Sequence, residues 1–423
     1  MYSSRRKFIG ASAGMAALAG MGWHPSMARA AQGERKFLFF FAGGAWDTTT
    51  VFDPHYNTDF IDMDPMTQPQ TIGRLTFTSG DDRPNVSRFF ERWGRRTAVI
   101  NGLDSHSVGH ASGTQLTLTG TSASSYPDWP TALAANGRGE YPLPHLVFSG
   151  PSIPGNSGSA VVRAGGGTLM DMINSGINGN IDNPVPTFDP PADAIIDAFV
   201  HKRIAKFAAQ HEIAGGEGYR RAGSFLNNTD RAMEIEGRQF EAGLGELGNT
   251  MLDQALKATE MMRLGLTRTA MIGIPGGWDC HGGVGVNAGQ FDNFFMALDI
   301  LMERMSTTPG LSTQWLADEV VIVAQSEFGR TPLLNGGGGK DHWPFTSSIV
   351  IGSGVNGGRN LGATDDALIG MPIDFQTGQA DPGGKMLGTE NLGVALLKLG
   401  GLDTDKFLPG IEPLNALLAD PGA

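Results

Sequence analysis

The chain has few of the groups that form covalent cross-links or that bind nucleic acid or membranes. Cys280 is the only cysteine among 423 residues, so no disulfide can form within the chain. The formal net charge is −12 and no long basic run follows residue 7, which argues against a nucleic-acid partner. The apolar segment 9–21 is shorter than the ~20 residues that a spanning helix needs. We therefore expect no permanent membrane anchor.

A dinucleotide-binding glycine fingerprint is also missing. The first strongly apolar run, 36–41, is followed by Gly43-Gly44-Ala45-Trp46-Asp47, which lacks the G-x-G-x-x-G spacing. An oxidoreductase that uses a dinucleotide is therefore a weak interpretation. The 61 glycines are spread along the chain without a fixed period, and they indicate a loop-rich protein.

Residues 1–31 resemble an export signal. Arg5 and Arg6 form a twin-arginine pattern, the weakly apolar segment 9–21 follows, and Ala28-Arg29-Ala30 offers a cleavage site. We expect the twin-arginine machinery to export the protein to the periplasm or beyond, and the leader to be removed. The alternative is a basic amphipathic amino terminus that arose by chance.

Short β-branched or apolar runs alternate with helical patterns over the rest of the chain. Strands are predicted at 36–41, 97–100, 145–148, 270–274, 319–325 and 347–351, and helices at 192–209, 224–264, 287–305 and 391–399. This alternation predicts an α/β fold with a mostly parallel central sheet and helices on both faces. We expect one domain over 32–423, with an insertion near 150–191 that is rich in Gly, Asn and Pro.

Acidic residues and histidines follow three of the predicted strands. Because parallel strands end at one edge of a sheet, these side chains are expected to meet there. Carboxylate oxygen and imidazole nitrogen are the ligands of divalent metals such as zinc, manganese, calcium or magnesium. The predicted metal ligands are Asp47, Asp279, His281, Glu327, Asp341 and His342. For an aspartate that follows a Gly-Gly-x-Trp segment, as Asp47 does, the alternative role is to cap the next helix.

Arg330 and the histidines near residue 110 are the remaining chemical candidates. The planar guanidinium of Arg330 suits phosphate or sulfate, although an ion pair with Glu327 three residues earlier is the simpler role. His106 or His110 can serve as a general acid/base or a ligand, or can be a hydrogen-bonded loop residue. The tetraglycine at 336–339 allows backbone to approach a bound ion closely.

The order of these motifs resembles the alkaline phosphatase/sulfatase-like superfamily, in its branch of twin-arginine-exported bacterial proteins. The resemblance covers nearly the whole chain after the leader. It is carried by 40–47, by Gly277-Trp278-Asp279-Cys280-His281, by 326–332 and by 339–343. It implies an alkaline phosphatase-like fold, one or two divalent metals, and hydrolysis of a phosphate or sulfate ester, from a small molecule or a polymer.

The resemblance also assigns roles to individual residues. It makes Asp47 the first metal-binding acid, Asp279 and His281 ligands of another metal, Glu327 an acidic ligand, and Asp341-His342 the last ligand position. The enzymes of the superfamily carry a nucleophile ten positions before the glycine of a Thr-Gly pair. Counting back from Gly120 reaches His110, with Ser107 and Ser112 as nearby hydroxyls.

Two hypotheses follow. The first is an exported metal-dependent hydrolase in which metal-activated water or His110 attacks the ester and Arg330 stabilises its oxygens. The second is a scaffold that has lost catalysis and binds a glycan, an envelope polymer or a partner protein. The histidine at the nucleophile position favours the second hypothesis.

Overall fold

The structure is a computed structural model that describes residues 33–139, 141–165, 177–178, 185–186, 190–211 and 247–419. Its centre is an eight-stranded sheet in the order β14-β4-β13-β10-β1-β9-β5-β6. The strands are β14 (Arg359–Leu361), β4 (Thr97–Asp104), β13 (Phe345–Gly352), β10 (Val320–Ser326), β1 (Lys36–Ala42), β9 (Thr269–Gly273), β5 (His145–Val147) and β6 (Val161–Arg163). All six predicted strands are therefore present, and the α/β class with a mostly parallel sheet is confirmed.

One strand of this sheet runs against the others. β13 pairs antiparallel with both β10 and β4, whereas β1 pairs in parallel with β10 and β9. The start of β13 therefore lies at the edge where β1, β9 and β10 end. This reversal brings the segment just before Phe345 to the same edge as the loops that follow the parallel strands.

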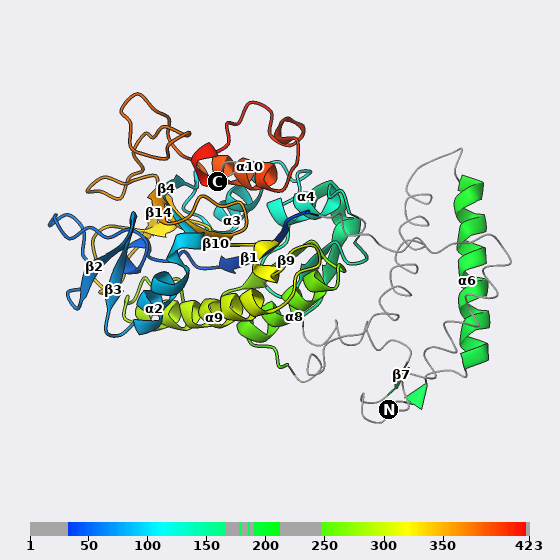
Figure 1. Ribbon diagram of the computed structural model, residues 1–423. Coiled ribbons are helices and arrows are strands. Elements are labelled where there is room, and N and C mark those ends of the chain that lie inside the picture. Colours follow the sequence, from blue (N-terminus) through cyan, green and yellow to red (C-terminus); the bar gives the residue numbers. More distant parts are fainter. Residues whose placement is uncertain are drawn as a thin grey trace.

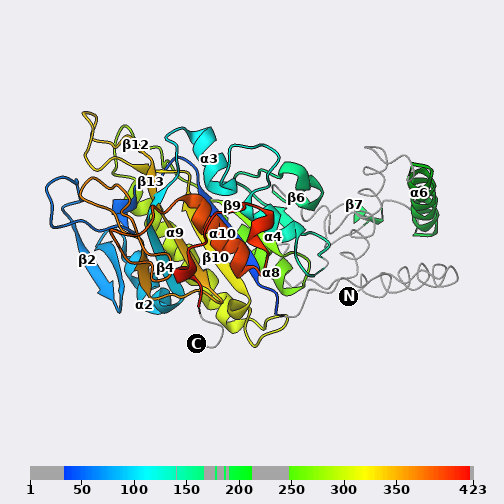
Figure 2. The ribbon, with the colours of Figure 1, turned by 90° about the horizontal axis from the view of Figure 1, so that it is seen from above.

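Helices cover both faces of the sheet (Figures 1 and 2). The face that presents Leu38 and Phe40 packs against α2 (Pro84–Trp93), α8 (Met251–Arg263) and α9 (Asn287–Thr307). The opposite face, with Phe37 and Phe39, packs against α3 (His110–Thr119), α4 (Trp129–Ala135) and α10 (Thr389–Leu399). β1 is buried along its whole length because both faces of the sheet are covered, so its sequence has no alternation of apolar and polar residues.

Several elements were not predicted from the sequence. A hairpin of β2 (Thr67–Ile72) and β3 (Leu75–Gly80) leads into α2, and β6 and β14 extend the central sheet at its two edges. The expected insertion at 150–191 begins with a 3-10 turn, Gly155–Ala160, and with β6, which pairs with β5. That first part therefore belongs to the central sheet. Most of the remainder of 150–191 lies outside the described residues.

The predicted helix at 192–209 corresponds to α6 (Pro190–His211), which stands apart from the sheet in Figure 1. The predicted helices at 287–305 and 391–399 correspond to α9 and α10. Of the predicted helical region 224–264, α8 is described, whereas 224–246 lies outside the described residues. Within the described part of the chain, no helix is long and apolar enough to cross a membrane. The proposed leader is not described.

Candidate metal centre

Three loops and a short hairpin bring the candidate side chains to one edge of the sheet. Asp279 and His281 follow β9, and Glu327 follows β10 directly. His342 arrives from β12 (His342–Trp343), which pairs antiparallel with β11 (Gly329–Arg330) and places Arg330 opposite His342. His110 is the first residue of α3, which packs beside α10 over the same end of the sheet.

The imidazole of His110 is oriented by a buried carboxylate. Its Nδ1 lies 2.8 Å from Oε1 of Glu327, a residue that is 1% exposed. The same Oε1 accepts a hydrogen bond from the backbone N–H of Gly44 at 2.6 Å, and Oε2 accepts one from the hydroxyl of Ser326 at 3.0 Å. Glu327 is thus fixed from two sides. Because it contacts Nδ1 of His110, the Nε2 atom of that ring is free to face the other candidate ligands.

Two further histidines are held in the same way. The Nδ1 atom of His281 lies 2.7 Å from Oδ1 of Asp341, and the Nδ1 atom of His342 lies 2.7 Å from the carbonyl oxygen of Val108. A carbonyl oxygen can only accept, so Nδ1 of His342 carries a proton. A neutral His342 therefore presents Nε2 as a lone pair, and an ionised Asp341 has the same effect on His281.

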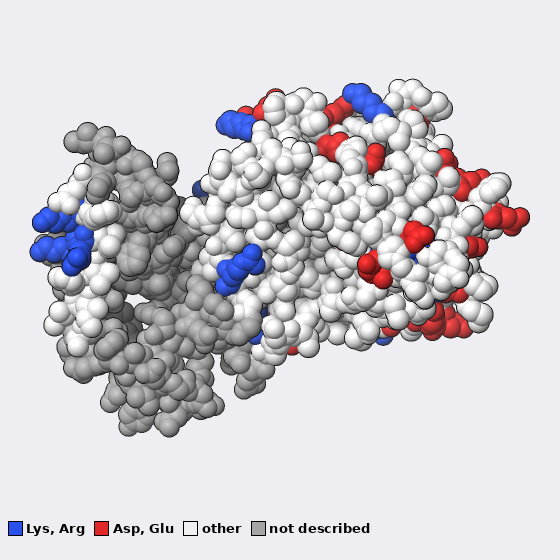
Figure 3. Space-filling view, turned by 180° about the vertical axis from the view of Figure 1, so that it is seen from behind, with Lys and Arg blue, Asp and Glu red and all other residues white. Residues whose placement is uncertain are grey.

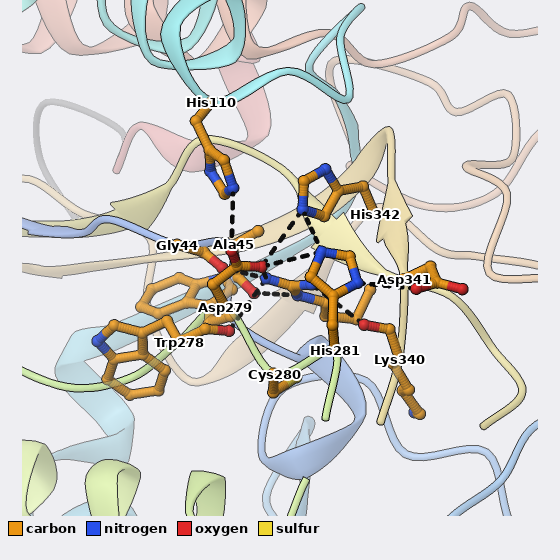
Figure 4. A network of polar contacts seen from close by, with 12 residues as sticks. Gly44, Ala45, His110, Trp278, Asp279, Cys280, His281, Lys340, Asp341 and His342 are labelled. Carbon is orange, nitrogen blue, oxygen red and sulfur yellow. Dashed lines mark hydrogen bonds and ion pairs between the residues drawn. The ribbon is translucent and has the colours of Figure 1, made fainter. Parts of the chain in front are cut away.

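The three Nε2 atoms converge on the carboxylate of Asp279 (Figure 4). The distance to an Asp279 oxygen is 3.5 Å from His110, 3.1 Å from His281 and 3.3 Å from His342. The Nε2 atoms of His281 and His342 are themselves 2.9 Å apart. The ligand atoms of His110, Asp279 and His342 all lie within 4.8 Å of one another, which is an arrangement that can hold a metal ion.

The centre is open to solvent on one side and backed by aromatic rings on another. The side chains of His110, Asp279 and His281 are 42%, 48% and 44% exposed, respectively. The buried ring of Phe328 packs against His110 and His342, with ring centroids 5.1 and 4.6 Å apart. A ligand can therefore reach the donors from solvent while their orientation is fixed from behind.

Hydrogen bonds and charges keep the two acids of the centre ionised. Burial acts to raise the pKa of Asp279, but its contacts with Arg330 and His342 and the charges of Arg330 and His281 outweigh burial and lower the pKa to about 2. Hydrogen bonding from His281 and from Asn335 lowers the pKa of Asp341 as well. Both carboxylates are therefore anionic across the physiological range, as metal coordination requires.

Arg330 lies beneath the centre and its guanidinium is used by the protein itself. Its Nη2 contacts Oδ1 of Asp279 at 2.7 Å, and the other nitrogens donate to backbone carbonyls, among them Ala45 at 2.7 Å and Lys340 at 3.1 Å. Its side chain is 0% exposed. The sequence suggested an anion-binding arginine or an ion pair with Glu327. The structure instead shows Arg330 fixing Asp279, with no surface open to a substrate anion.

The structure separates Asp47 from the histidines. The side chain of Asp47 caps a 3-10 turn (Thr48–Thr50), where Oδ1 accepts from the N–H and the hydroxyl of Thr49, and Oδ2 lies 3.0 Å from Nζ of Lys340. Asp47 is 3% exposed. Capping, the alternative that the sequence left open for this aspartate, is what the structure shows. Among the described residues, the group of potential ligands around Asp279 does not include Asp47.

The other motifs contribute support. A side chain at Gly339 would lie 2.2 Å from the carbonyl oxygens of Cys280 and His281, so the tetraglycine allows close approach to backbone at this point. Trp46 and Trp278 are buried in the core.

The hydroxyls of Ser107 and Ser112, near His110 in the sequence, hydrogen-bond each other at 2.6 Å. The supporting role of the Val108 carbonyl gives no signal in the sequence, because any residue has a carbonyl.

His106 lies in the loop before α3 and pairs with other acids. Its Nδ1 is 3.2 Å from Oδ2 of Asp104 and its Nε2 is 3.2 Å from Oε2 of Glu390. Hydrogen bonds that His106 donates to these two carboxylates raise its pKa to about 10, against a smaller opposing effect of burial. Both ring nitrogens are therefore occupied within the protein, and of the two histidines that the sequence singled out, His110 is the one at the centre.

These features define an α/β protein with a His/Asp group at the carboxyl edge of its parallel strands. A family model described as "Protein of unknown function (DUF1501)" matches residues 34–371, and the chain belongs to this family. A comparison with curated proteins gives no match. The matched range contains every residue of the centre.

Proposed function

We propose that this edge binds a divalent cation and that the protein is a metal-dependent hydrolase of phosphate or sulfate esters. The observation that carries the proposal is the convergence of the Nε2 atoms of His110, His281 and His342 on the carboxylate of Asp279. Each imidazole is fixed at Nδ1 by a separate acceptor, the pattern by which proteins orient metal-binding histidines.

The distances fit a single ion held by His110, Asp279 and His342, with His281 beside Asp279 and His342. Zinc–nitrogen bonds of about 2.0–2.1 Å place tetrahedral donors roughly 3.3 Å apart. The separations of 3.1, 3.3 and 3.5 Å from Asp279 bracket that value. The distance of 2.9 Å between Nε2 of His281 and Nε2 of His342 also supports a bound cation. Two lone pairs at that distance repel each other unless a proton or a cation lies between them.

The residues present suit zinc or manganese better than calcium or magnesium. Three imidazole nitrogens and one carboxylate are the donors that zinc, manganese or iron accept, whereas calcium and magnesium prefer a shell of oxygens. The carboxylates of Glu327 and Asp341, expected as ligands, support the proposal as acceptors for His110 and His281. A bound divalent ion would supply Lewis acidity, activating water near neutral pH and drawing charge from the ester oxygens.

The chain's own residues would hold and orient the reactants. Asp279 and the histidines would hold the cation at a solvent-open position, and Arg330 keeps Asp279 anionic from below. His110 is better suited as a ligand than as a nucleophile, because its Nε2 belongs to the donor group and its Nδ1 faces Glu327. Water is therefore the nucleophile that this geometry supports. The resemblance to the alkaline phosphatase/sulfatase-like superfamily supports the reaction class.

The test combines metal analysis with turnover. Purified mature protein is expected to contain about one zinc or manganese per chain and to hydrolyse aryl phosphate or aryl sulfate esters. Asp279→Ala removes the carboxylate shared by all three histidines and should abolish both properties, whereas the control Asp405→Ala, at an exposed aspartate, should change neither. A protein with no metal, and with turnover no higher than that of Asp279→Ala, would rule the hydrolase out.

A non-catalytic scaffold is the second candidate, and two observations favour it. His110 occupies the position at which the resemblance leads one to expect a nucleophile, and the side chain of Arg330 is fully buried. In this case metal would bind and Asp279→Ala would lose it, but no ester would be cleaved. Thermal stabilisation by a glycan or an envelope polymer, with no product formed, would identify such a protein.

We also propose export through the twin-arginine pathway. The supporting observation is the order of Arg5-Arg6, an apolar segment and Ala28-Arg29-Ala30 at the start of the chain. Replacement of both arginines by lysine retains the positive charge and should leave the protein in the cytoplasm at full length. If the Arg5→Lys/Arg6→Lys variant were exported as well as the wild type, the proposal would fail.

A further inference from the structure

We infer that the ammonium group of Lys340 is the resident cation of the Asp47 carboxylate, so that Asp47 holds no metal and the edge takes one divalent ion. The sequence placed Asp47 with the metal ligands, because it follows β1 at the edge where Asp279 and Glu327 also lie. That Asp47 holds no metal follows from its own contacts. The count of one ion rests on the metal site proposed above.

Both oxygens of Asp47 are already paired within the protein. Oδ2 lies 3.0 Å from Nζ of Lys340, and Oδ1 accepts from the N–H of Thr49 at 3.1 Å and from its hydroxyl at 2.7 Å. Nζ of Lys340 also donates to the Thr49 hydroxyl at 3.0 Å. With side chains 4% and 1% exposed, Asp47 and Lys340 form a desolvated ion pair.

The backbone around Lys340 keeps its side chain at Asp47. The N–H of Lys340 donates to the carbonyl of Cys280 at 3.2 Å, and its carbonyl accepts from Arg330 at 3.1 Å. Figure 4 shows the Lys340 side chain directed away from the three histidines. A divalent ion at Asp47 would have to displace a buried ammonium group that is anchored by its own backbone.

The charges balance in the same way on both sides of Arg330. Arg330 neutralises Asp279, which faces the histidines, and Lys340 neutralises Asp47, which does not. Of these two aspartates, Asp279 is the one with imidazole partners among the described residues, at 3.1–3.5 Å. The chain supplies a counter-ion to both carboxylates, but Asp47 is 4% exposed and has both oxygens paired, whereas Asp279 is 48% exposed and faces the imidazoles, so Asp279 is the one that remains available to a metal.

The first experiment counts metal ions. Chelator-treated wild type, Asp47→Asn and Asp279→Asn are dialysed against Zn²⁺ and analysed for bound zinc. We expect about one zinc per chain in the wild type and in Asp47→Asn, and an at least tenfold weaker affinity in Asp279→Asn. Two zinc ions in the wild type, one of them lost in Asp47→Asn, would overturn the inference, as would loss of a single zinc in Asp47→Asn.

The second experiment tests the ion pair without reference to metal. Lys340→Met leaves Asp47 buried and unpaired, and should lower Tm by about 10 °C. The double variant Asp47→Asn/Lys340→Met removes both charges and should recover most of that loss. Lys406, which is 77% exposed, provides the control Lys406→Met with little change. A Lys340→Met variant as stable as Lys406→Met would contradict the pairing, and if it fails to fold, the zinc counts decide.

The two experiments separate this inference from the proposed function. If the wild type binds no zinc or manganese, the metal-dependent hydrolase fails, and the count of one ion fails with it. The assignment of Lys340 to Asp47 is then judged by the Tm values alone. A Lys340→Met variant that gains a second zinc, and loses it when Asp47→Asn is added, would show directly that the ammonium occupies a cation position.

Discussion

Nδ1 of His110 lies 2.8 Å from Oε1 of Glu327, a residue 217 positions later in the chain. Both were expected to act directly, His110 as a catalytic group and Glu327 as a metal ligand. The contact gives them different roles. Glu327 orients the imidazole from the buried side, and the Nε2 atom of His110 is left to face Asp279.

Substitution of Glu327 by glutamine should therefore weaken metal binding without removing a ligand. The amide has nearly the same shape, but it supplies a weaker acceptor to His110 Nδ1, so the orientation and basicity of the ring suffer. We expect the Kd for zinc to rise by about 10–100-fold. Competition with a chromogenic chelator measures it.

Asp341→Asn is the matched comparison, because Asp341 supports His281 in the same way at 2.7 Å but is exposed. We expect a smaller increase in Kd there, since solvent can replace part of the lost hydrogen bond. Equal zinc affinity in the wild type and in Glu327→Gln would show that His110 is not a ligand.

The position of the centre could be predicted from the sequence because the secondary structure is strongly encoded. The runs that became β1, β9 and β10 are apolar, and polar residues follow each of them. The general rule that ligands gather at the carboxyl ends of parallel strands then gave the correct edge for Asp279, His281 and Glu327.

The division of roles could not be predicted, because it depends on contacts between distant segments. Asp47 and Asp279 both come directly after a glycine-rich segment that ends in tryptophan, yet one faces Lys340 and the other faces three histidines. The antiparallel direction of β13, which brings His342 to the edge, also has no local signal. Burial of Arg330 depends on four carbonyl groups from three separate loops.

The last glycine of the tetraglycine should be far more sensitive to substitution than the first. A Cβ at Gly339 would lie 2.2 Å from the carbonyl oxygens of Cys280 and His281, whereas a Cβ at Gly336 would meet nothing within 4 Å. Gly339→Ala should therefore destabilise the protein by about 1–3 kcal/mol and reduce zinc affinity, because the loop that carries His281 must shift.

Gly336→Ala is the control, and its free energy of unfolding should stay within about 0.5 kcal/mol of the wild-type value. Urea denaturation and zinc titration of the two variants provide the comparison. Indistinguishable variants would mean that the backbone at 339 is not packed against the His281 loop as closely as the structure indicates.

His106 should make stability depend on pH above neutrality. Its two carboxylate partners raise the pKa of the folded state from 6.5 to about 10. The stabilising charge is therefore fully present below about pH 6.5 and is lost as pH rises toward 10. Because the side chain is 49% exposed, we expect the contribution to be only about 1 kcal/mol.

The measurement is the difference in unfolding free energy between the wild type and His106→Asn at pH 6 and pH 9.5. Asparagine tolerates the positive φ of 57° at this position, so the backbone is not strained by the change. The difference should be larger at pH 6 and shrink at pH 9.5. A difference that does not change with pH would show that His106 is not held as a cation.

Arg330 should be the most sensitive position beneath the centre. Lysine retains the charge but cannot reproduce the planar fork that contacts Asp279 and the carbonyls of Ala45 and Lys340 together. Several buried acceptors would lose their donor, and we expect Arg330→Lys to cost about 3–5 kcal/mol of unfolding free energy. Arg88→Lys changes an arginine that is 54% exposed, and should cost less than about 1 kcal/mol.

A measurement of metal binding shows whether Arg330 positions Asp279 or only stabilises the fold. If Arg330 acts through Asp279, the zinc affinity of the folded Arg330→Lys variant should fall together with its stability. Leu396→Ala is the control, because Leu396 is a buried residue of α10 that makes none of the contacts described for the centre. It should destabilise the protein but leave the zinc affinity of the folded fraction unchanged. Titration at a temperature well below Tm for both variants makes the comparison. Unchanged zinc affinity in Arg330→Lys would show that Asp279 keeps its position without the guanidinium.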